Sequence, residues 1–148
     1  MFDFQNLVKK INIINGLRVS NKKTLFIAIS NLVAKKIDQD KKLILKQLND
    51  QESKTNSGIL NGIAVPKIIV NQKNNIYFFI VLSKPVVYDS ADKYPVDLIF
   101  LSLYPKNDIN HLVAISKVSG ILKSDELCKK LRATKKSEEI FSLLNIER

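Results

Sequence analysis

The segment 61–67, NGIAVPK, ends in a lysine, Lys67, whose position the residues before it restrict. Asn61 and Gly62 are typical of a tight turn, and Pro66 keeps the residue before it out of the helical region. Lys67 therefore follows a stiff connection, an arrangement suited to a side chain that binds or reacts. A lysine has a pKa of about 10.4 and no lone pair until it loses its proton, so Lys67 is better suited to holding an anion than to attacking one. The alternative is a lysine that only points into solvent.

His111 is the only histidine in the chain and the second candidate for chemistry. Imidazole has a pKa of about 6.5, so at neutral pH one ring nitrogen is free to attack an electrophile. A helix-start side chain without any chemistry is the alternative for His111. One histidine and one cysteine, Cys128, do not make a usual zinc site, and no phosphate-binding glycine–lysine loop or nucleophile elbow is present. We therefore expect neither a metal nor a cofactor.

The charge of the chain is strongly basic but dispersed. The 148 residues carry 24 basic and 14 acidic side chains, a net charge of +10. The lysines fall in scattered doublets, with no long basic block and no aromatic residues interleaved among them. A solvated surface explains this pattern better than a nucleic-acid interface does. The alternative, a basic module that binds nucleic acid or an acidic partner, predicts affinity that falls steeply with added salt.

The composition also bears on the compartment. Hydrophobic residues make up 45% of the chain, enough for a real core. The longest strongly apolar run, Ile76–Leu82, is far shorter than the roughly 20 residues that cross a bilayer. The opening residues MFDFQNLVKK lack the apolar core of a signal peptide, and the single cysteine, Cys128, excludes an internal disulfide and fits a small side chain on a helix. We expect a cytoplasmic location and no membrane insertion.

Two helices are predicted before residue 53. Residues 16–20 alternate like a short strand, and Ser20 can cap the helix that follows. Helical spacing then places five apolar residues on one stripe: Leu25, Ile29, Leu32, Val33 and Ile37. Asp40 can start a second helix, which is expected to fray near Glu52.

Strands and further helices are predicted beyond that point. Residues 53–62 are polar and contain glycine, as in a loop. Extended structure is predicted for residues 63–70, 76–82 and 96–104, the last two largely buried because they are almost wholly apolar. A helix is predicted over residues 111–123, and Ser124 and Ser137, each followed by two acids, can cap two short C-terminal helices. This order indicates one compact α/β domain with its sheet covered on both faces.

Several segments, in order, resemble one protein family. Residues 56–67, NSGILNGIAVPK, are similar to the signature S-T-G-I-G-N-G-I-A-I-P-H, and residues 84–105 to its downstream P-I-x-F-D-x-x-D-x-x-P-V-D-L-x-F segment. NHLVAISKVSGIL resembles the family helix H-L-x-x-L-x-x-V-A-x-x-L, and CKKLRATKKSEEIFSLL resembles the ending L-R-x-A-x-S-x-E-E-L. The chain thus resembles an EIIA component of the bacterial phosphoenolpyruvate-dependent phosphotransferase system, fructose–mannitol class, and most of all the nitrogen-regulatory EIIA proteins.

The resemblance covers about residues 5–146 and implies a fold and an activity. The implied fold is a mixed β-sheet sandwiched between helices, with residues 1–148 as a single EIIA type-2-like domain. Members of the family accept a phosphoryl group from the carrier HPr, or its nitrogen-branch counterpart, on the signature histidine. They pass it to a sugar-transporting domain or use it as a regulatory mark. The position that matches this histidine is Lys67.

The resemblance also assigns the surroundings of that position. The family helix before the signature ends in Arg–Glu, with the arginine near the phosphohistidine, whereas this chain has Gln51–Glu52. The family Ser–Thr pair is matched by Asn56–Ser57, and one glycine by Leu60, which does not adopt a positive φ easily. The residues that keep the family pattern are Gly58, Asn61, Gly62, Pro66 and His111. The family's second histidine, which this last residue matches, lies beside the first and supports the phosphorylated state.

Three functions remain as alternatives. The first is an EIIA-like regulatory protein that is not phosphorylated at the usual site and acts by protein–protein contact around Lys67, His111 and residues 53–62. The resemblance implies partners such as a potassium-transport regulator, a sensor kinase or a metabolic enzyme, together with an HPr-type carrier. The second is an active phosphoryl-transfer component that uses His111 or an atypical route. The third is the basic binding module. We favour the first.

Overall fold

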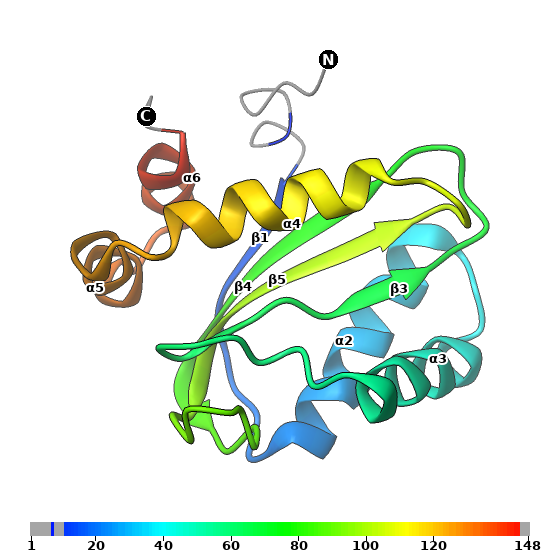
Figure 1. The fold of residues 1–148 in the computed structure, drawn as a ribbon, viewed down its shortest axis with the longest axis horizontal. Coiled ribbons are helices and arrows are strands. Elements are labelled where there is room, and N and C mark those ends of the chain that lie inside the picture. The colour runs from blue at the N-terminus through cyan, green and yellow to red at the C-terminus, as the bar shows by residue number, and fades with distance from the viewer. Residues whose placement is uncertain (1–6, 8–10, 146–148) are drawn as a thin grey trace.

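The computed structural model describes residues 7 and 11–145, and these form one mixed β-sheet between two layers of helices (Figure 1). The strands are β1 (Ile11–Leu17), β2 (Ile63–Ala64), β3 (Lys67–Ile69), β4 (Ile76–Val86) and β5 (Val96–Tyr104). The helices are α2 (Lys22–Ile37), α3 (Lys41–Lys54), α4 (Asn110–Ile121), α5 (Asp125–Ala133) and α6 (Ser137–Leu144). The predicted fold class, a mixed sheet sandwiched between helices, is confirmed.

The sheet is built around the antiparallel pair of β4 and β5. β1 adds to β4 in parallel, and β2 and β3 both add in parallel to the other side of β5. The carbonyl of Pro66, which lies between the two short strands, accepts a hydrogen bond from the Ser102 backbone N–H at 3.1 Å. A proline is tolerated here because β2 and β3 lie at the sheet edge, where its missing N–H breaks no ladder.

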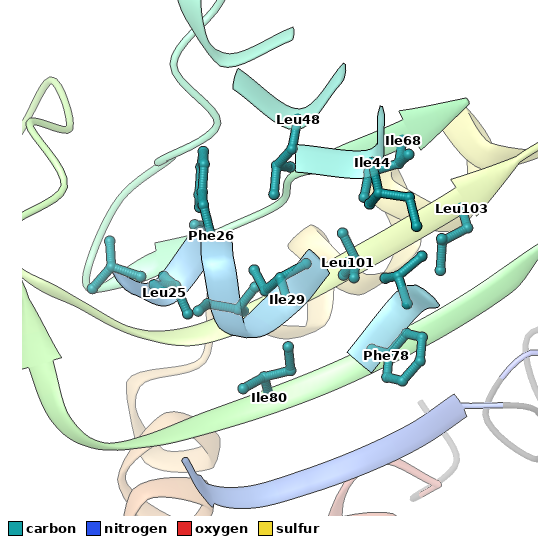
Figure 2. Packing of buried hydrophobic residues seen from close by; sticks show 14 of the residues in the cluster. Leu25, Phe26, Ile29, Ile44, Leu48, Ile68, Phe78, Ile80, Leu101 and Leu103 are labelled. Carbon is teal, nitrogen blue, oxygen red and sulfur yellow. The ribbon is translucent and has the colours of Figure 1, made fainter. Parts of the chain in front are cut away.

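Each face of the sheet buries its own apolar cluster. On one face, side chains of α2 and α3 pack on β3, β4 and β5, as Figure 2 shows for Ile29, Leu48 and Leu101. On the other face, α4, α5 and α6 cover a second cluster that includes Phe79 and Phe100 (Figure 1). The prediction that the central strands are buried on both sides is confirmed, because successive residues of a strand point to opposite faces.

The helix starts agree with the sequence in two cases and differ in two. Asp40 caps α3 through the Lys42 N–H at 2.9 Å, and Ser124 caps α5 through the Leu127 N–H at 3.2 Å. The prediction of Ser20 as the cap of α2 is wrong, because Asn21 forms a reciprocal capping box with Thr24. The prediction of Ser137 as a cap is also wrong. Ser137 is already helical, and Lys136 precedes α6 without a side-chain cap.

Several element boundaries also shift. The short strand predicted at residues 16–20 is instead β1, which ends at Leu17 because its pairing with β4 covers Ile11–Leu17. Helix α3 continues two residues past Glu52, to Lys54. The strand predicted to end near residue 82 continues, after an irregularity in its pairing with β5, as far as Val86. No helix among the described residues is long and apolar enough to cross a bilayer.

The thiol of Cys128 gives a first testable prediction. Cys128 lies on a helix, α5, as the sequence predicted. Its thiol is buried and donates to the carbonyl of Leu122 at 3.2 Å. Burial raises the pKa of this thiol. We therefore expect Ellman's reagent to modify the native protein at least about a hundredfold more slowly than the urea-unfolded chain at the same pH. Equal rates would show that Cys128 is accessible in the folded protein. Because the folded pKa lies above the unfolded one, this group lowers stability as pH rises above about 9.

Candidate functional site

Lys67 is the first residue of β3, at the edge of the sheet, and its side chain lies on the α4 side. Its neighbour Ile68 belongs to the cluster beneath α2 and α3, so the alternation of the strand directs Lys67 to the opposite face. Lys67 pairs in register with Ser102 of β5. It is half-buried, and among the described residues its ammonium has neither an ion-pair nor a hydrogen-bond partner.

Gln51 is placed close to the start of β3 by the packing of α3. This helix runs alongside β3 in the opposite direction (Figure 1). Near the far end of the strand, the Gln47 side-chain carbonyl accepts a hydrogen bond from the Ile69 backbone N–H. Gln51 lies one helical turn further along the same face of α3, toward the Lys67 end of the strand. Gln51 therefore supplies no cation there.

His111 lies in the first turn of α4 and is buried, with 7% of its surface exposed. Its ring stacks on Tyr104, with centroids 3.6 Å apart and planes 4° from parallel. Its Nδ1 is within hydrogen-bond distance of the Asp108 carbonyl oxygen. A carbonyl only accepts, so Nδ1 carries the hydrogen, and Nε2 of the neutral ring keeps its lone pair.

Ser102 completes what we call the α4-side cluster: Lys67, Ser102, Tyr104 and His111. Residues of β5 alternate between the two faces, and Ser102 and Tyr104 fall on the side of α4. The Ser102 hydroxyl is fully buried and has no hydrogen-bond partner among the described residues. Burial raises the pKa of the Tyr104 hydroxyl, which stays neutral. The cluster therefore holds one fixed cation and no carboxylate.

The predicted loop at 53–62 begins two residues later, after Lys54, and residues 55–62, which we call the signature loop, are held by a dense set of hydrogen bonds. The Asn56 side-chain amide donates to the carbonyls of Tyr88 and Asp89 at 3.0 and 3.2 Å. The Asn56 side-chain oxygen accepts from the Gly58 N–H at 2.8 Å. The Ser57 carbonyl accepts from the Val65 N–H at 2.9 Å. Hydrogen bonds within the chain therefore tie the loop to the start of the 88–95 connection and to Val65.

Glu52 anchors the same loop through a ring of four residues, which we call the Glu52 network. Its carboxylate accepts from the Ser57 N–H at 2.9 Å and pairs with the Lys22 ammonium at 2.9 Å. Lys22 lies 4.1 Å from the centre of the Tyr88 ring, and the Tyr88 hydroxyl and the Ser57 hydroxyl share a hydrogen bond of 2.6 Å. Burial, with a smaller contribution from the Glu52 charge, raises the pKa of Tyr88. A lysine from α2 thus lies close to the carboxylate that lacks a neighbouring arginine.

Asn61 and Gly62 form the tight turn that the sequence predicted, with φ of 56° and 84°. Leu60 precedes the two left-handed positions, so its side chain is accommodated without a positive φ. Arg132 of α5 holds the turn. Its Nε lies 2.9 and 3.0 Å from the two carboxylate oxygens of Asp97, and its Nη2 donates to the Asn61 carbonyl at 2.7 Å. The positive φ of Gly62 strains any other residue, and a Cβ there would also lie 2.7 Å from that nitrogen and 3.1 Å from the Pro95 carbonyl oxygen.

The structure therefore divides the predicted site residues into three groups. Lys67 and His111 belong to the α4-side cluster. Asn56 and Ser57 are hydrogen-bonded to Tyr88, whose ring belongs to the core beneath α2 and α3, and Glu52 accepts from the Ser57 N–H. The turn is held separately by α5. Sequence reasoning missed residues that position the loop, among them Asp92, whose carboxylate accepts from the Asn61 N–H at 2.8 Å, and Lys22, Tyr88, Asp97 and Arg132. The last three lie in segments that resemble the family, whereas Lys22 belongs to an ordinary-looking lysine doublet.

Comparison with known proteins decides the family. Residues 6–146 match the family described as "Phosphoenolpyruvate-dependent sugar phosphotransferase system, EIIA 2". The chain belongs to this family. Over 147 residues this EIIA is 33% identical to the "Nitrogen regulatory protein homolog" of Haemophilus influenzae, a match that covers 95% of this chain and 89% of the relative. Over 127 residues it is 31% identical to the "Nitrogen regulatory protein" of Klebsiella oxytoca, covering 84% and 78%.

Solved structures agree with this assignment. The nitrogen regulatory protein IIA-Ntr of Neisseria meningitidis superimposes on the EIIA chain with a TM-score of 0.82 at 27% identity, covering 93% of this chain and 94% of that one. The IIA mannitol protein of Escherichia coli shares the fold, with a TM-score of 0.75 at 19% identity over 90% and 95% of the two chains. The resemblance to nitrogen-regulatory EIIA proteins is confirmed.

Gly58 of the EIIA signature loop gives a second prediction. A Cβ at this position would lie 2.1 Å from the Ser90 hydroxyl oxygen, and Ser90 is itself buried. We expect Gly58→Ala to lower the free energy of unfolding by about 1–3 kcal/mol, because the crowded loop must shift. Gly120→Ala in α4 is the matched control. Nothing lies within 4 Å of a Cβ there, so the same change should be neutral or stabilising by up to about 1 kcal/mol. Urea denaturation of both variants measures the difference, and equal effects would contradict the loop geometry.

Proposed function

We propose that this nitrogen-regulatory EIIA-like protein is not phosphorylated at Lys67 and acts by protein–protein contact. The contact surface would be formed by the α4-side cluster and the signature loop. The observation that carries the proposal is the ammonium of Lys67, which is half-buried at the edge of the sheet and unpaired among the described residues. Phosphoryl transfer requires a nucleophile with a free lone pair in line with the phosphorus. An ammonium nitrogen has no lone pair to offer.

The signature loop supports a constitutive binding role. In the family, phosphate arrives at the site and leaves it, so the local charge alternates. Here a permanent cation takes the place of the acceptor, and Glu52 and Arg132 hold the loop through hydrogen bonds within the chain. A surface that is already ordered loses less conformational entropy when a partner binds. Partners that prefer the unphosphorylated form would therefore find their binding surface always present.

A specific observation keeps a second candidate function open, in which His111 is the phosphoryl acceptor. The Asp108 carbonyl fixes the hydrogen on Nδ1, so Nε2 has the lone pair that the reaction needs. The transfer would form a bond from Nε2 to phosphorus as the bond to the carrier's histidine nitrogen breaks. Against this role, the ring is buried and covered on one face by Tyr104. A carrier would have to dock so that phosphorus reaches the exposed edge of the ring.

Phosphoryl transfer from phosphoenolpyruvate through Enzyme I and an HPr-type carrier tests the proposal. Intact mass, measured at neutral pH because phosphohistidine is lost in acid, would be compared for the native chain, Lys67→His and His111→Ala. We expect no added phosphate on the native chain and one phosphate on Lys67→His. This third prediction depends on the substituted imidazole restoring the lone pair.

The remaining outcomes separate the alternatives. Phosphate on the native chain that disappears in His111→Ala would contradict the proposal and make His111 the acceptor. If no variant is phosphorylated, carrier binding measured by titration distinguishes a lost docking surface from a misplaced histidine.

The partner class also belongs to the proposal. A solved complex within this fold joins enzyme IIA mannitol to phosphorylated enzyme IIB mannitol, both from Escherichia coli. By analogy we propose a protein partner for this chain, in the cytoplasm: an HPr-type carrier, or a regulatory target such as a transport regulator, sensor kinase or metabolic enzyme. The signature loop and the α4-side cluster would provide the contact.

A further inference from the structure

A groove lies where the first turn of α2 meets the last turns of α3. Its volume is about 440 Å³. Phe26, Ile27 and Leu45 contribute its apolar lining, and Lys22, Lys23 and Glu52 its charged lining. Ile27 is 40% exposed, unusual for a large apolar side chain on a helix whose stripe is otherwise buried. The groove is separate from the α4-side cluster, because α2 and α3 cover the opposite face of the sheet.

The uncompensated charge of this groove is positive. Its one carboxylate, Glu52, is already paired with Lys22 and accepts the Ser57 N–H. Lys23 is exposed and has no ion-pair partner among the described residues. The first turn of α2 contains no acid, so the positive end of the helix dipole adds to the charge of Lys23. Apolar lining beside uncompensated positive charge is complementary to a ligand that carries both apolar groups and carboxylates.

We propose that this groove binds an acidic amphipathic helix of a partner protein. The helix would place apolar side chains against Ile27 and Leu45 and carboxylates beside Lys23 and the start of α2. Docking of a helix into an apolar groove is a common recognition mode, in which a few side chains carry most of the affinity. This inference rests on the proposed regulatory function and adds to it a second surface and the chemistry of its partner.

Lys22 connects the groove to the signature loop. Lys22 and Glu52 both line the groove, and the Lys22 ammonium pairs with the Glu52 carboxylate that accepts from Ser57. A partner carboxylate that enters the groove competes with Glu52 for the same cation. Binding in the groove should therefore change the environment of the Ser57 N–H. The two are linked by the Lys22–Glu52 ion pair and the hydrogen bond from Ser57 to Glu52, both 2.9 Å. The chemical shift of the Ser57 backbone amide should therefore report whether the groove is occupied.

Titration with a short amidated helical peptide, leucine on one face and glutamate on the other, tests the inference. Binding is followed by calorimetry and by amide chemical shifts of the full chain. We expect saturable binding that moves the resonances of Lys23, Ile27 and Ser57. Lys23→Glu and, separately, Ile27→Ser should each weaken binding by about tenfold, since each removes one main contact. Lys35→Glu is the matched control, because it makes the same charge change at an exposed site in the last turn of α2.

Three results would overturn the inference. They are no saturable binding, equal weakening by Lys23→Glu and Lys35→Glu, or undiminished binding of a peptide in which serine replaces leucine. The last two would show that the general charge of the protein binds the peptide. Lys23 and Ile27 are both exposed, so Lys23→Glu and Ile27→Ser should keep the native amide spectrum. The titration needs no carrier and no phosphate. Phosphorylation of the native chain would therefore refute the proposed function and leave the peptide result as it stands.

Discussion

Glu52→Ala should lower the free energy of unfolding by about 2–4 kcal/mol, the largest effect that we expect from a surface-proximal residue. The substitution leaves the Lys22 ammonium beside the Tyr88 ring without its counter-ion and the Ser57 N–H without its acceptor. Lys22 keeps a quarter of its side chain exposed, so water reduces the loss below that of a fully buried pair. Urea denaturation measures the effect.

Asp50→Ala is the matched control for this prediction. Asp50 lies on the same helix and pairs with Lys46 at 3.4 Å, but both side chains are mostly exposed. An exposed pair of this kind contributes about 0.5 kcal/mol or less. Glu52→Gln should fall between the two, because the amide oxygen can still accept from Ser57 while Lys22 remains unpaired. Equal effects of Glu52→Ala and Asp50→Ala would mean that the Glu52 network does not hold the loop.

Arg132→Ala should destabilise the fold by about 2–3 kcal/mol and loosen the turn at Asn61 and Gly62. The substitution removes both hydrogen bonds to Asp97 and the one to the Asn61 carbonyl. Amide hydrogen exchange of residues 59–63 should accelerate more than exchange in β4. Lys130→Ala is the matched control on α5, since Lys130 makes only an exposed pair with Glu126 and should change stability by less than about 0.5 kcal/mol.

The pH dependence of the Arg132→Ala effect provides a further check. Burial raises the pKa of Asp97, although Arg132 acts in the opposite direction. Without the guanidinium the folded pKa rises further above that of the unfolded chain, so protonation favours the folded variant. The stability deficit of Arg132→Ala should therefore shrink as pH falls from 7 toward about 5. If the stability deficit of Arg132→Ala stays constant between pH 7 and about 5, the Asp97 carboxylate is not the group whose charge Arg132 stabilises.

Together these two sets of contacts explain why the signature loop is ordered. Glu52 holds the loop at Ser57, and Arg132 holds it at Asn61. Each comes from a helix that could transmit binding elsewhere to the loop: α3 carries Glu52 beside the proposed groove, and α5 carries Arg132. Both anchors are side chains of the chain itself, which agrees with the proposal of a fixed binding surface. The affinity of a partner for Glu52→Ala and for Arg132→Ala, compared with its affinity for the native chain, would show how much of the binding depends on the ordered loop.

The sequence by itself determined the features that depend on local rules. The family could be recognised because the signature, its downstream segment and the C-terminal ending are each contiguous. The turn at Asn61 and Gly62, the caps Asp40 and Ser124 and the apolar strands follow from the conformational preferences of neighbouring residues. The lysine in place of the acceptor histidine is likewise visible only as a residue in a motif, and its role stays a prediction.

The tertiary structure decided which distant residues position the loop. Lys22 reaches Glu52 because α2 and α3 pack as antiparallel neighbours. Arg132 reaches Asn61 across 71 residues of sequence because α5 docks beside the start of β5, where Asp97 lies. Periodicity predicts which face of a helix is buried, but the partner across the interface depends on how the helices pack, which local preferences do not determine. The same reason explains why an unremarkable lysine doublet contains the cation that holds Glu52. The sequence predicts that Lys67 lies in an extended segment. Only the packed sheet shows that it pairs with Ser102 of β5, on the face that α4 covers.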